Sequence, residues 1–311
     1  MPDCLIVSAA ADEFAEEIER LADFSLPVQA CTSTEKALEE YTDQTVLFGN
    51  PDMIASILPE MPSVDWVQST WAGITPLLAI DRRDYVLTNV RDVFGPQMSE
   101  YVMGYLLAHE LKVLQRMKHQ RKHNWFDTRS GSLQGKRLGI MGTGSIGRHI
   151  AQTATFFGIK VTGLSRSGVP LPAFEKVVPV SQLHDFLGEI DYLISTLPQT
   201  DETDNLLDKA ALARLPAHAY FINIGRSNVI NDEALIDALQ HGKLAGATLD
   251  VFDGEPVPQD SPLWDTPDLS ITAHIAAISH PSLIAPIFVE NYRRYTNKQP
   301  LKYIVDFSAA Y

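Results

Sequence analysis

Three residues that could carry chemistry stand in separate motifs of the second half of the chain: Arg226, Glu255 and His274. Each motif follows a predicted strand, and the runs are Phe221 to Arg226, Leu249 to Pro256 and Ile271 to Ala276. In a doubly wound parallel sheet, ligands bind outside the carboxyl ends of the strands. We therefore expect the three side chains to converge on one crevice.

These residue types suit the reduction of a 2-keto acid. A guanidinium binds a carboxylate through two hydrogen bonds and stays charged, so Arg226 would hold the acid group and polarise the carbonyl. An imidazole titrates near working pH, which suits His274 for protonating the oxygen that becomes an alkoxide. Glu255 would orient that imidazole and favour its protonated form. Taken singly, each has a structural alternative: a core histidine, a turn glutamate and an ion-paired arginine.

A glycine-rich turn precedes these motifs in the chain. A predicted strand over 137–141 leads into the pattern G-x-G-x-x-G and then into a predicted helix, and the run is Gly142-Thr143-Gly144-Ser145-Ile146-Gly147. Gly142 would permit the tight turn, Gly144 the close approach of a pyrophosphate, and Gly147 the packing of the helix on the strand. A turn without a ligand is the alternative. The surrounding series of strands and helices favours a dinucleotide at the positive end of the helix.

The end of the next predicted strand bears on which dinucleotide is bound. NAD enzymes place an acid about twenty residues beyond the glycines, where it accepts hydrogen bonds from the ribose hydroxyls. This chain has Ser165-Arg166-Ser167 there, without a carboxylate. Arg166 would pair with a 2′-phosphate and the two serines would donate hydrogen bonds to it, which favours NADP(H). If Arg166 only stacks on adenine, NAD(H) remains possible.

Strands and helices alternate along both parts of the chain. Strands are expected over 5–7, 45–48, 66–68 and 85–88, and then over 137–141, 160–164, 192–196, 220–224, 247–251 and 269–272. Such alternation predicts an α/β fold of doubly wound parallel sheets covered by helices on both faces. A long helix is expected over 97–123, and its basic second half would be a solvated face or part of a subunit contact. Another helix is expected over 282–297, kinked or starting late because of Pro286.

The composition argues against several classes of function. The 311 residues are enough for two domains. A formal charge of −14 disfavours non-specific binding to nucleic acid or to anionic membranes, and no apolar run reaches the roughly 20 residues that span a bilayer. The two cysteines offer neither a disulfide framework nor a metal-ligand spacing. We expect a cytoplasmic protein without a metal.

The set and order of these motifs resemble the D-isomer-specific 2-hydroxyacid dehydrogenases. The resemblance covers nearly the whole chain and is densest from Gly142 to Ala276. In that family the arginine matching Arg226 binds the substrate, the histidine matching His274 is the acid/base, and the glutamate matching Glu255 supports it.

The resemblance also implies further contacts with the cofactor. The aspartate matching Asp250 would contact the nicotinamide carboxamide. A loop over 197–203 would line the cofactor, and the remaining expected contacts are Leu197, Pro198, Thr203, Ile224 and Ala276. The chain departs from the family at Ala273, where a proline often stands before the histidine, and at Ser165, where an acid would be needed for NAD.

Trp71, Ala72 and Gly73 match the loop whose backbone N–H groups hold the substrate carboxylate in the family. A glycine permits close backbone approach, and Trp71 would either wall a small pocket or pack in the core. Together with Ser-Arg-Ser at the cofactor, this loop most resembles the glyoxylate/hydroxypyruvate reductase branch.

The resemblance implies a Rossmann cofactor domain, residues 96–280, inserted in a flavodoxin-like substrate domain made of residues 1–95 and 281–311. Hinges are expected near Gly95 and His280, and a homodimer is expected through the long helix. We expect NADP(H)-dependent reduction of a small 2-keto acid to the D-2-hydroxy acid. The alternatives are a dehydrogenase for a bulkier 2-keto acid and a non-catalytic, dinucleotide-sensing binding protein.

Overall fold

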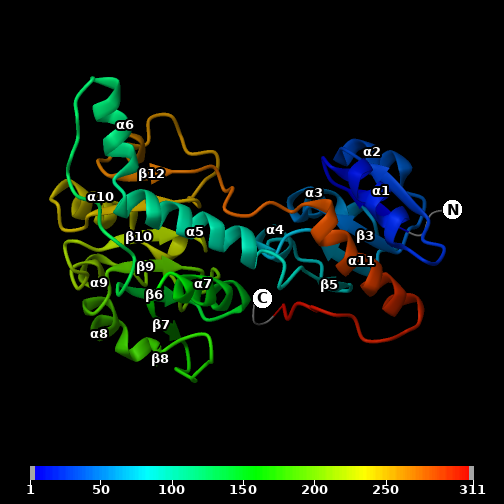
Figure 1. Ribbon diagram of the computed structural model, residues 1–311. Helices are drawn as coiled ribbons and strands as arrows, with labels where there is room; N and C mark the ends of the chain where they lie inside the picture. Colours follow the sequence, from blue (N-terminus) through cyan, green and yellow to red (C-terminus); the bar gives the residue numbers. More distant parts are fainter. Residues whose placement is uncertain (1–3, 308–311) are drawn as a thin grey trace. The chain divides into compact units, whose positions relative to one another are not determined.

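The computed structural model describes residues 4–307, and the chain divides into two compact units. Unit 1 combines the N-terminal part up to Val93 with the segment from Ser279 onward, and unit 2 runs from Phe94 to Ile278. Each unit is a parallel sheet with helices packed against it (Figure 1).

Unit 1 is built on a five-stranded parallel sheet in the order β2-β1-β3-β4-β5. Its strands are β1 (Cys4–Val7), β2 (Val28–Cys31), β3 (Val46–Gly49), β4 (Trp66–Ser69) and β5 (Val86–Thr88). This is the strand order of flavodoxin-like sheets. Every residue of β1, β3 and β4 is buried, as expected of parallel strands that are covered on both faces.

Helices bury both faces of this sheet. They are α1 (Ala11–Leu21), α2 (Thr34–Glu40), α3 (Pro51–Ile57), α4 (Thr75–Leu78) and α11 (Pro281–Thr296), with a short 3₁₀ turn, η1, at Leu58–Glu60. On one face, Phe48 and Trp66 stack against Phe288 of α11, and α1 packs beside α11 (Figure 1). On the other face, Leu47 and Val67 join the apolar core. α11 begins at Pro281, where a first-turn proline is tolerated, and it contains Pro286. The helix therefore does not start late, and a kink at Pro286, the other alternative, stays a prediction.

Unit 2 is built on a seven-stranded parallel sheet in the order β12-β11-β10-β9-β6-β7-β8. Its strands are β6 (Arg137–Met141), β7 (Lys160–Ser165), β8 (Lys176–Pro179), β9 (Tyr192–Ser195), β10 (Tyr220–Asn223), β11 (Gly246–Leu249) and β12 (Leu269–Ile271). The chain order reverses between β6 and β9, the topological switch point at which doubly wound sheets bind ligands.

The helices of unit 2 also lie on both faces of its sheet. They are α5 (Gly95–Glu110), α6 (Val113–Arg121), α7 (Ser145–Phe156), α8 (Leu183–Gly188), α9 (Lys209–Leu212) and α10 (Asp232–Gln240), with short 3₁₀ turns η2 (Val180–Gln182), η3 (Ser227–Val229) and η4 (Pro262–Asp265). Alternate residues of the central strands enter two separate cores. One core holds Ile140, Ile194 and Ile222, and the other holds Met141, Leu193 and Phe221. The predicted α/β fold with two doubly wound parallel sheets is confirmed.

One edge strand of each sheet, β2 and β8, is not predicted from the sequence. An edge strand pairs on one side only, so it needs no continuous apolar run. Three of the four residues of β2 are only half-buried, and β8 begins with the exposed Lys176 and ends with Pro179. Their patterns resemble those of loops.

The single long helix predicted over 97–123 is also wrong. The structure ends α5 at Glu110 and starts α6 at Val113, because Lys112 adopts left-handed backbone angles with φ 53°. Arg116 compensates for the break: it donates to the carbonyl of Leu111 at 2.8 Å and to that of Thr128 at 2.8 Å. The segment after α6 is thereby tied back to it.

A membrane-spanning helix and a candidate metal site are both absent from the part of the chain that the structure describes. Within residues 4–307, no helix combines the length and apolar character needed to cross a bilayer. No group of three or more His, Cys, Asp or Glu side chains in the same range is placed to hold a metal ion.

Candidate active site

The three predicted catalytic residues follow adjacent strands. Arg226 comes after β10, Glu255 after β11 and His274 after β12, and these strands are neighbours in the order β12-β11-β10. Parallel strands end at the same edge of a sheet, so the fold places all three loops at the carboxyl edge.

His274 and Glu255 form a direct pair. Nδ1 of His274 lies 2.8 Å from Oε2 of Glu255, and Oε1 of Glu255 accepts the backbone N–H of Phe252 at 3.0 Å. The carboxylate fixes the orientation of the imidazole and leaves Nε2 for a substrate. The side chain of His274 is 48% exposed, so it is not a core histidine.

The loop that carries His274 is held by a buried carboxylate, that of Asp250. Oδ1 of Asp250 accepts the Thr272 hydroxyl at 2.6 Å and the Ile275 N–H at 2.9 Å, and Oδ2 accepts the Ala276 N–H at 2.9 Å. The backbone carbonyl of Asp250 accepts the His274 N–H at 3.0 Å. His274 has φ 53°, a strained conformation for a non-glycine residue. These four hydrogen bonds offset that strain and set the direction of the imidazole.

Arg226 directly precedes η3 at the end of β10. Its Nη1 donates to the carbonyl of Gly225 at 2.7 Å, and its own carbonyl accepts from the Asn223 side chain at 3.0 Å. Burial lowers the pKa of the Arg226 guanidinium, and the charge of Glu255 partly opposes this. A guanidinium remains cationic at neutral pH despite such a shift. Among residues 4–307, no carboxylate pairs directly with Arg226, so its charge is available to an anionic ligand.

The glycine-rich turn connects β6 to α7. A Cβ on Gly147 would lie 2.0 Å from the carbonyl oxygen of Gly142, which has φ 100°. These two positions therefore require glycine for the strand and helix to meet. A Cβ on Gly144, the N-cap of α7, would meet nothing within 4 Å. Space thus remains beside the backbone at the positive end of the helix, which fits a pyrophosphate.

The three residues predicted to read the cofactor's ribose lie at and just after the end of β7. The Ser165 hydroxyl accepts the Gly168 N–H at 3.1 Å. Arg166 pairs with Glu202 at 3.0 Å, and both side chains are about two-thirds exposed. Ser167 is exposed. The sequence alone does not indicate Glu202 as the partner of Arg166, because only the fold brings the two residues together.

The predicted cofactor-lining loop over 197–203 is closed by Thr203. The Thr203 hydroxyl donates to the carbonyl of Pro198 at 2.8 Å and accepts the Thr200 N–H at 2.9 Å. A Cβ on Gly225 would lie 2.6 Å from the carbonyl oxygen of Leu197, so this loop packs directly against the end of β10. Two further predicted cofactor contacts, Ile224 and Ala276, are buried at the same edge of the sheet.

In unit 1, the predicted carboxylate-binding residues Trp71, Ala72 and Gly73 follow β4. All three are half-buried, so Trp71 is not a core residue. The Ser69 hydroxyl lies 3.0 Å from both the N–H and the carbonyl of Trp71. Within the described residues, the N–H groups of Ala72 and Gly73 donate to no protein acceptor. Two unused donors on one turn suit an anion.

One contact at the site escaped the sequence analysis. The Tyr101 hydroxyl of α5 lies 2.6 Å from that of Thr272, which in turn donates to Asp250. No motif links a helix residue to a strand end 171 positions away, so only the fold reveals it.

Comparisons with known proteins identify relatives of this chain. Residues 103–276 match the model of the D-isomer specific 2-hydroxyacid dehydrogenase NAD binding domain. A glyoxylate/hydroxypyruvate reductase A from Serratia proteamaculans is 36% identical over 185 residues, which are 60% of this chain and 59% of that protein.

Solved structures cover nearly the whole chain. A D-isomer specific 2-hydroxyacid dehydrogenase family protein from Aeromonas salmonicida has a TM-score of 0.94 and 39% identity, covering 98% of both chains. An NADPH-dependent glyoxylate/hydroxypyruvate reductase from Sinorhizobium meliloti, in complex with NADP and sulfate, has a TM-score of 0.87 and 27% identity, covering 99% of both chains. The expected relationship is confirmed, and the chain belongs to the D-isomer specific 2-hydroxyacid dehydrogenases, which are oxidoreductases that use a nicotinamide dinucleotide.

Proposed function

We propose that this protein reduces a small 2-keto acid of the glyoxylate or hydroxypyruvate type with NADPH and yields the D-2-hydroxy acid. The observation that carries the proposal is the His274–Glu255 pair at 2.8 Å, at the same sheet edge as Arg226, which pairs with no carboxylate of the described residues. This edge belongs to the sheet that carries the dinucleotide turn. The names of the Serratia and Sinorhizobium relatives support the choice of substrate and cofactor.

Each catalytic residue has one task in the proposed reaction. Arg226 binds the substrate carboxylate and polarises the keto group. When bound, the nicotinamide supplies the hydride for the keto carbon. His274 donates the proton from Nε2 to the keto oxygen, so a ketone, a hydride and a proton give the alcohol. Glu255 contacts Nδ1 of His274 and keeps the imidazole oriented during the transfer.

Asp250 acts through the loop that carries His274 in this scheme. We propose that it holds the His274 loop through the hydrogen bonds of both carboxylate oxygens. The nicotinamide contact implied by the family resemblance remains a prediction, as do the cofactor contacts of Leu197, Pro198, Ile224 and Ala276. Trp71, Ala72 and Gly73 would bind the substrate carboxylate through their loop.

The preference for NADP(H) rests on Ser165, Arg166 and Ser167. A 2′-phosphate would replace the carboxylate of Glu202 on the Arg166 guanidinium. Since that pair is well exposed, giving it up costs little. Relatives in complex with NADP or NADPH support this preference.

We also propose a homodimer formed through the α6 region of unit 2. Leu114, Met117 and Trp125 are exposed, with Trp125 90% accessible. Apolar side chains gathered at such a site are typical of an interface. Both cysteines, Cys4 and Cys31, are free and buried, in keeping with a protein that works in the reducing cytoplasm.

A substrate panel tests the proposal. Glyoxylate, hydroxypyruvate, pyruvate and phenylpyruvate would each be offered with NADPH and with NADH, and loss of the reduced cofactor followed by absorbance. We expect the highest kcat/KM for glyoxylate or hydroxypyruvate with NADPH, and a D product by chiral chromatography. Preference for phenylpyruvate would favour a dehydrogenase for bulkier acids. Tight NADPH binding without turnover would favour a dinucleotide-sensing protein.

A further inference from the structure

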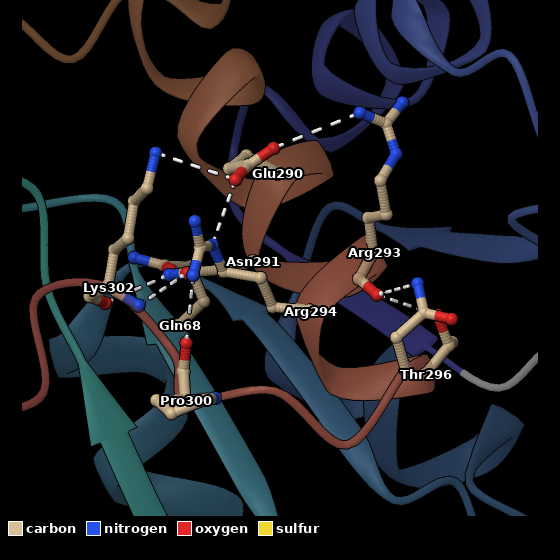
Figure 2. A network of polar contacts seen from close by, with 9 residues as sticks. Gln68, Glu290, Asn291, Arg293, Arg294, Thr296, Pro300 and Lys302 are labelled. Carbon is tan, nitrogen blue, oxygen red and sulfur yellow. Dashed lines mark hydrogen bonds and ion pairs between the residues drawn. The ribbon is translucent and has the colours of Figure 1, made fainter.

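Two buried amides link α11 to β4 in unit 1. Gln68 and Asn291 are both 0% exposed, and Nδ2 of Asn291 donates to Oε1 of Gln68 at 2.9 Å (Figure 2). Burying an amide is costly unless its donors and acceptors are all bonded. Such a pair within an apolar layer calls for an explanation beyond packing.

The remaining bonds of Gln68 run to the carboxyl ends of β4 and β5 and to Asn89, which follows β5. Its Oε1 also accepts the Thr88 hydroxyl at 2.8 Å, and its Nε2 donates to the carbonyls of Ser69 and Asn89, each at 3.0 Å. An amide has two donors and two acceptor sites. All four of Gln68 are used, so its orientation is fixed.

Asn89 carries the network into the loop proposed to bind the carboxylate. Its side chain is buried, and its Nδ2 donates to the carbonyl of Ala72 at 2.8 Å. Its Oδ1 accepts from Nε of Arg91 at 3.3 Å. The turn over 69–73 is therefore held at Ser69 by Gln68 and at Ala72 by Asn89, on either side of Trp71.

Asn291 secures the other end of the network. Its Oδ1 accepts the N–H of Lys302 at 2.8 Å, and its Nδ2 also donates to the Lys302 carbonyl at 3.1 Å. Figure 2 shows Asn291 between Gln68 of β4 and the segment that follows α11. The segment around Lys302 and the amide of Gln68 are thus locked by one side chain.

We propose that Gln68 and Asn89 are positioning residues for the substrate carboxylate, with Asn291 holding Gln68 in place. The inference rests on the proposed function, because it takes the turn over 69–73 as the carboxylate site. Within residues 4–307, the N–H groups of Ala72 and Gly73 have no protein acceptor, so the backbone conformation of the turn aims them. A turn fixed before binding does not lose conformational freedom when the substrate arrives. If the turn samples other conformations, the apparent affinity equals the intrinsic affinity multiplied by the fraction of molecules whose turn is in the binding conformation.

The test compares two buried glutamines of the same unit. Gln68→Met removes the network. Gln44→Met is the matched control, because Gln44 is 5% exposed and, among the described residues, its side chain bonds only to Glu40 and Thr42. Both variants lose buried hydrogen bonds, so both should lower Tm. We expect Gln68→Met alone to raise KM for hydroxypyruvate about tenfold, with kcat and the Kd of NADPH nearly unchanged.

Asn89→Asp is a second variant, made at the other attachment of the turn. It keeps the size of the side chain and the acceptor for Arg91 but loses the donor to the carbonyl of Ala72. We expect it to raise KM as Gln68→Met does. It also keeps the inference testable if Gln68→Met fails to fold.

Hydrogen exchange of the peptide over 69–73 provides a readout that needs no substrate. The N–H groups of Thr70 and Trp71 are hydrogen-bonded, and we expect their exchange to speed up in Gln68→Met and Asn89→Asp but not in Gln44→Met. Equal exchange and equal KM in Gln68→Met and Gln44→Met would overturn the inference. A wild-type protein that reduces no 2-keto acid would overturn the proposed function instead, while the exchange comparison would still decide whether this network holds the turn.

Discussion

Gly144 allows cofactor binding to be separated from folding. It is the N-cap of α7 and has extended backbone angles, φ −69° and ψ −167°, that alanine adopts without strain. A Cβ at this position would meet no protein atom within 4 Å. In Gly144→Ala, the free protein should therefore fold normally, and its free energy of unfolding should rise by about 0.4–1 kcal/mol because the unfolded chain loses freedom.

Binding should respond in the opposite direction. The methyl group would stand where the pyrophosphate approaches the backbone N–H groups of α7. Forcing one extra methyl group into a packed contact costs about 1–3 kcal/mol. This corresponds to a Kd for NADPH raised roughly 5- to 150-fold.

Two other glycines of unit 2 serve as controls. Gly104→Ala adds a methyl group to an open position of α5 and should leave the Kd of NADPH unchanged. Gly147→Ala should lower Tm, because its Cβ would lie 2.0 Å from a backbone oxygen. Titration calorimetry with NADPH and thermal unfolding of the free protein give both quantities. Wild-type affinity in Gly144→Ala would refute the proposed placement of the pyrophosphate.

Three further predictions address the cofactor, pH and assembly. Arg166→Ala should raise the Kd of NADPH about tenfold and leave that of NADH unchanged; equal changes in both would contradict the proposed 2′-phosphate contact. Burial raises the pKa of Asp191, but hydrogen bonds from Arg137 and His218 outweigh it and hold the pKa below its ordinary value of 3.8. Asp191→Asn should therefore lower the free energy of unfolding by about 1 kcal/mol at pH 7. The difference between wild type and variant should shrink as the pH falls below 3.8, because the wild-type carboxylate becomes protonated. Denaturant titrations that show a constant difference down to pH 3 would argue against this explanation. Leu114→Glu should convert a dimer to a monomer in sedimentation equilibrium, and an unchanged mass would place the interface elsewhere.

The central strands and the order of the chemical motifs could be predicted from the sequence. β6, β9 and β10 lie inside the sheet and are covered on both faces, so each is a mostly apolar run. Such a run can be recognised in the sequence without knowing which strands it pairs with. The glycine-rich turn and the Arg226 motif follow such runs, at the ends of β6 and β10. The carboxyl edge of a parallel sheet then brings Arg226, Glu255 and His274 together without further information.

The rest depends on contacts that a single run of residues does not carry. The break at Lys112 has no glycine or proline to mark it, and its compensation by Arg116 involves carbonyls up to 12 positions away. The pairing of Arg166 with Glu202 joins two loops. The network from Asn291 through Gln68 spans 223 positions. In each case the sequence shows a polar residue, but only the folded structure shows which residue it contacts.

The proposed proton donor is the claim on which the account depends most. His274→Gln keeps a polar side chain near Glu255 but removes the ionisable nitrogen. The decisive measurement is kcat for hydroxypyruvate reduction by this variant, alongside its Kd for NADPH. We expect kcat to fall by about 10²- to 10⁴-fold, the usual contribution of a general acid, with the Kd unchanged. A variant that binds NADPH normally and reduces hydroxypyruvate at close to the wild-type rate would contradict the account.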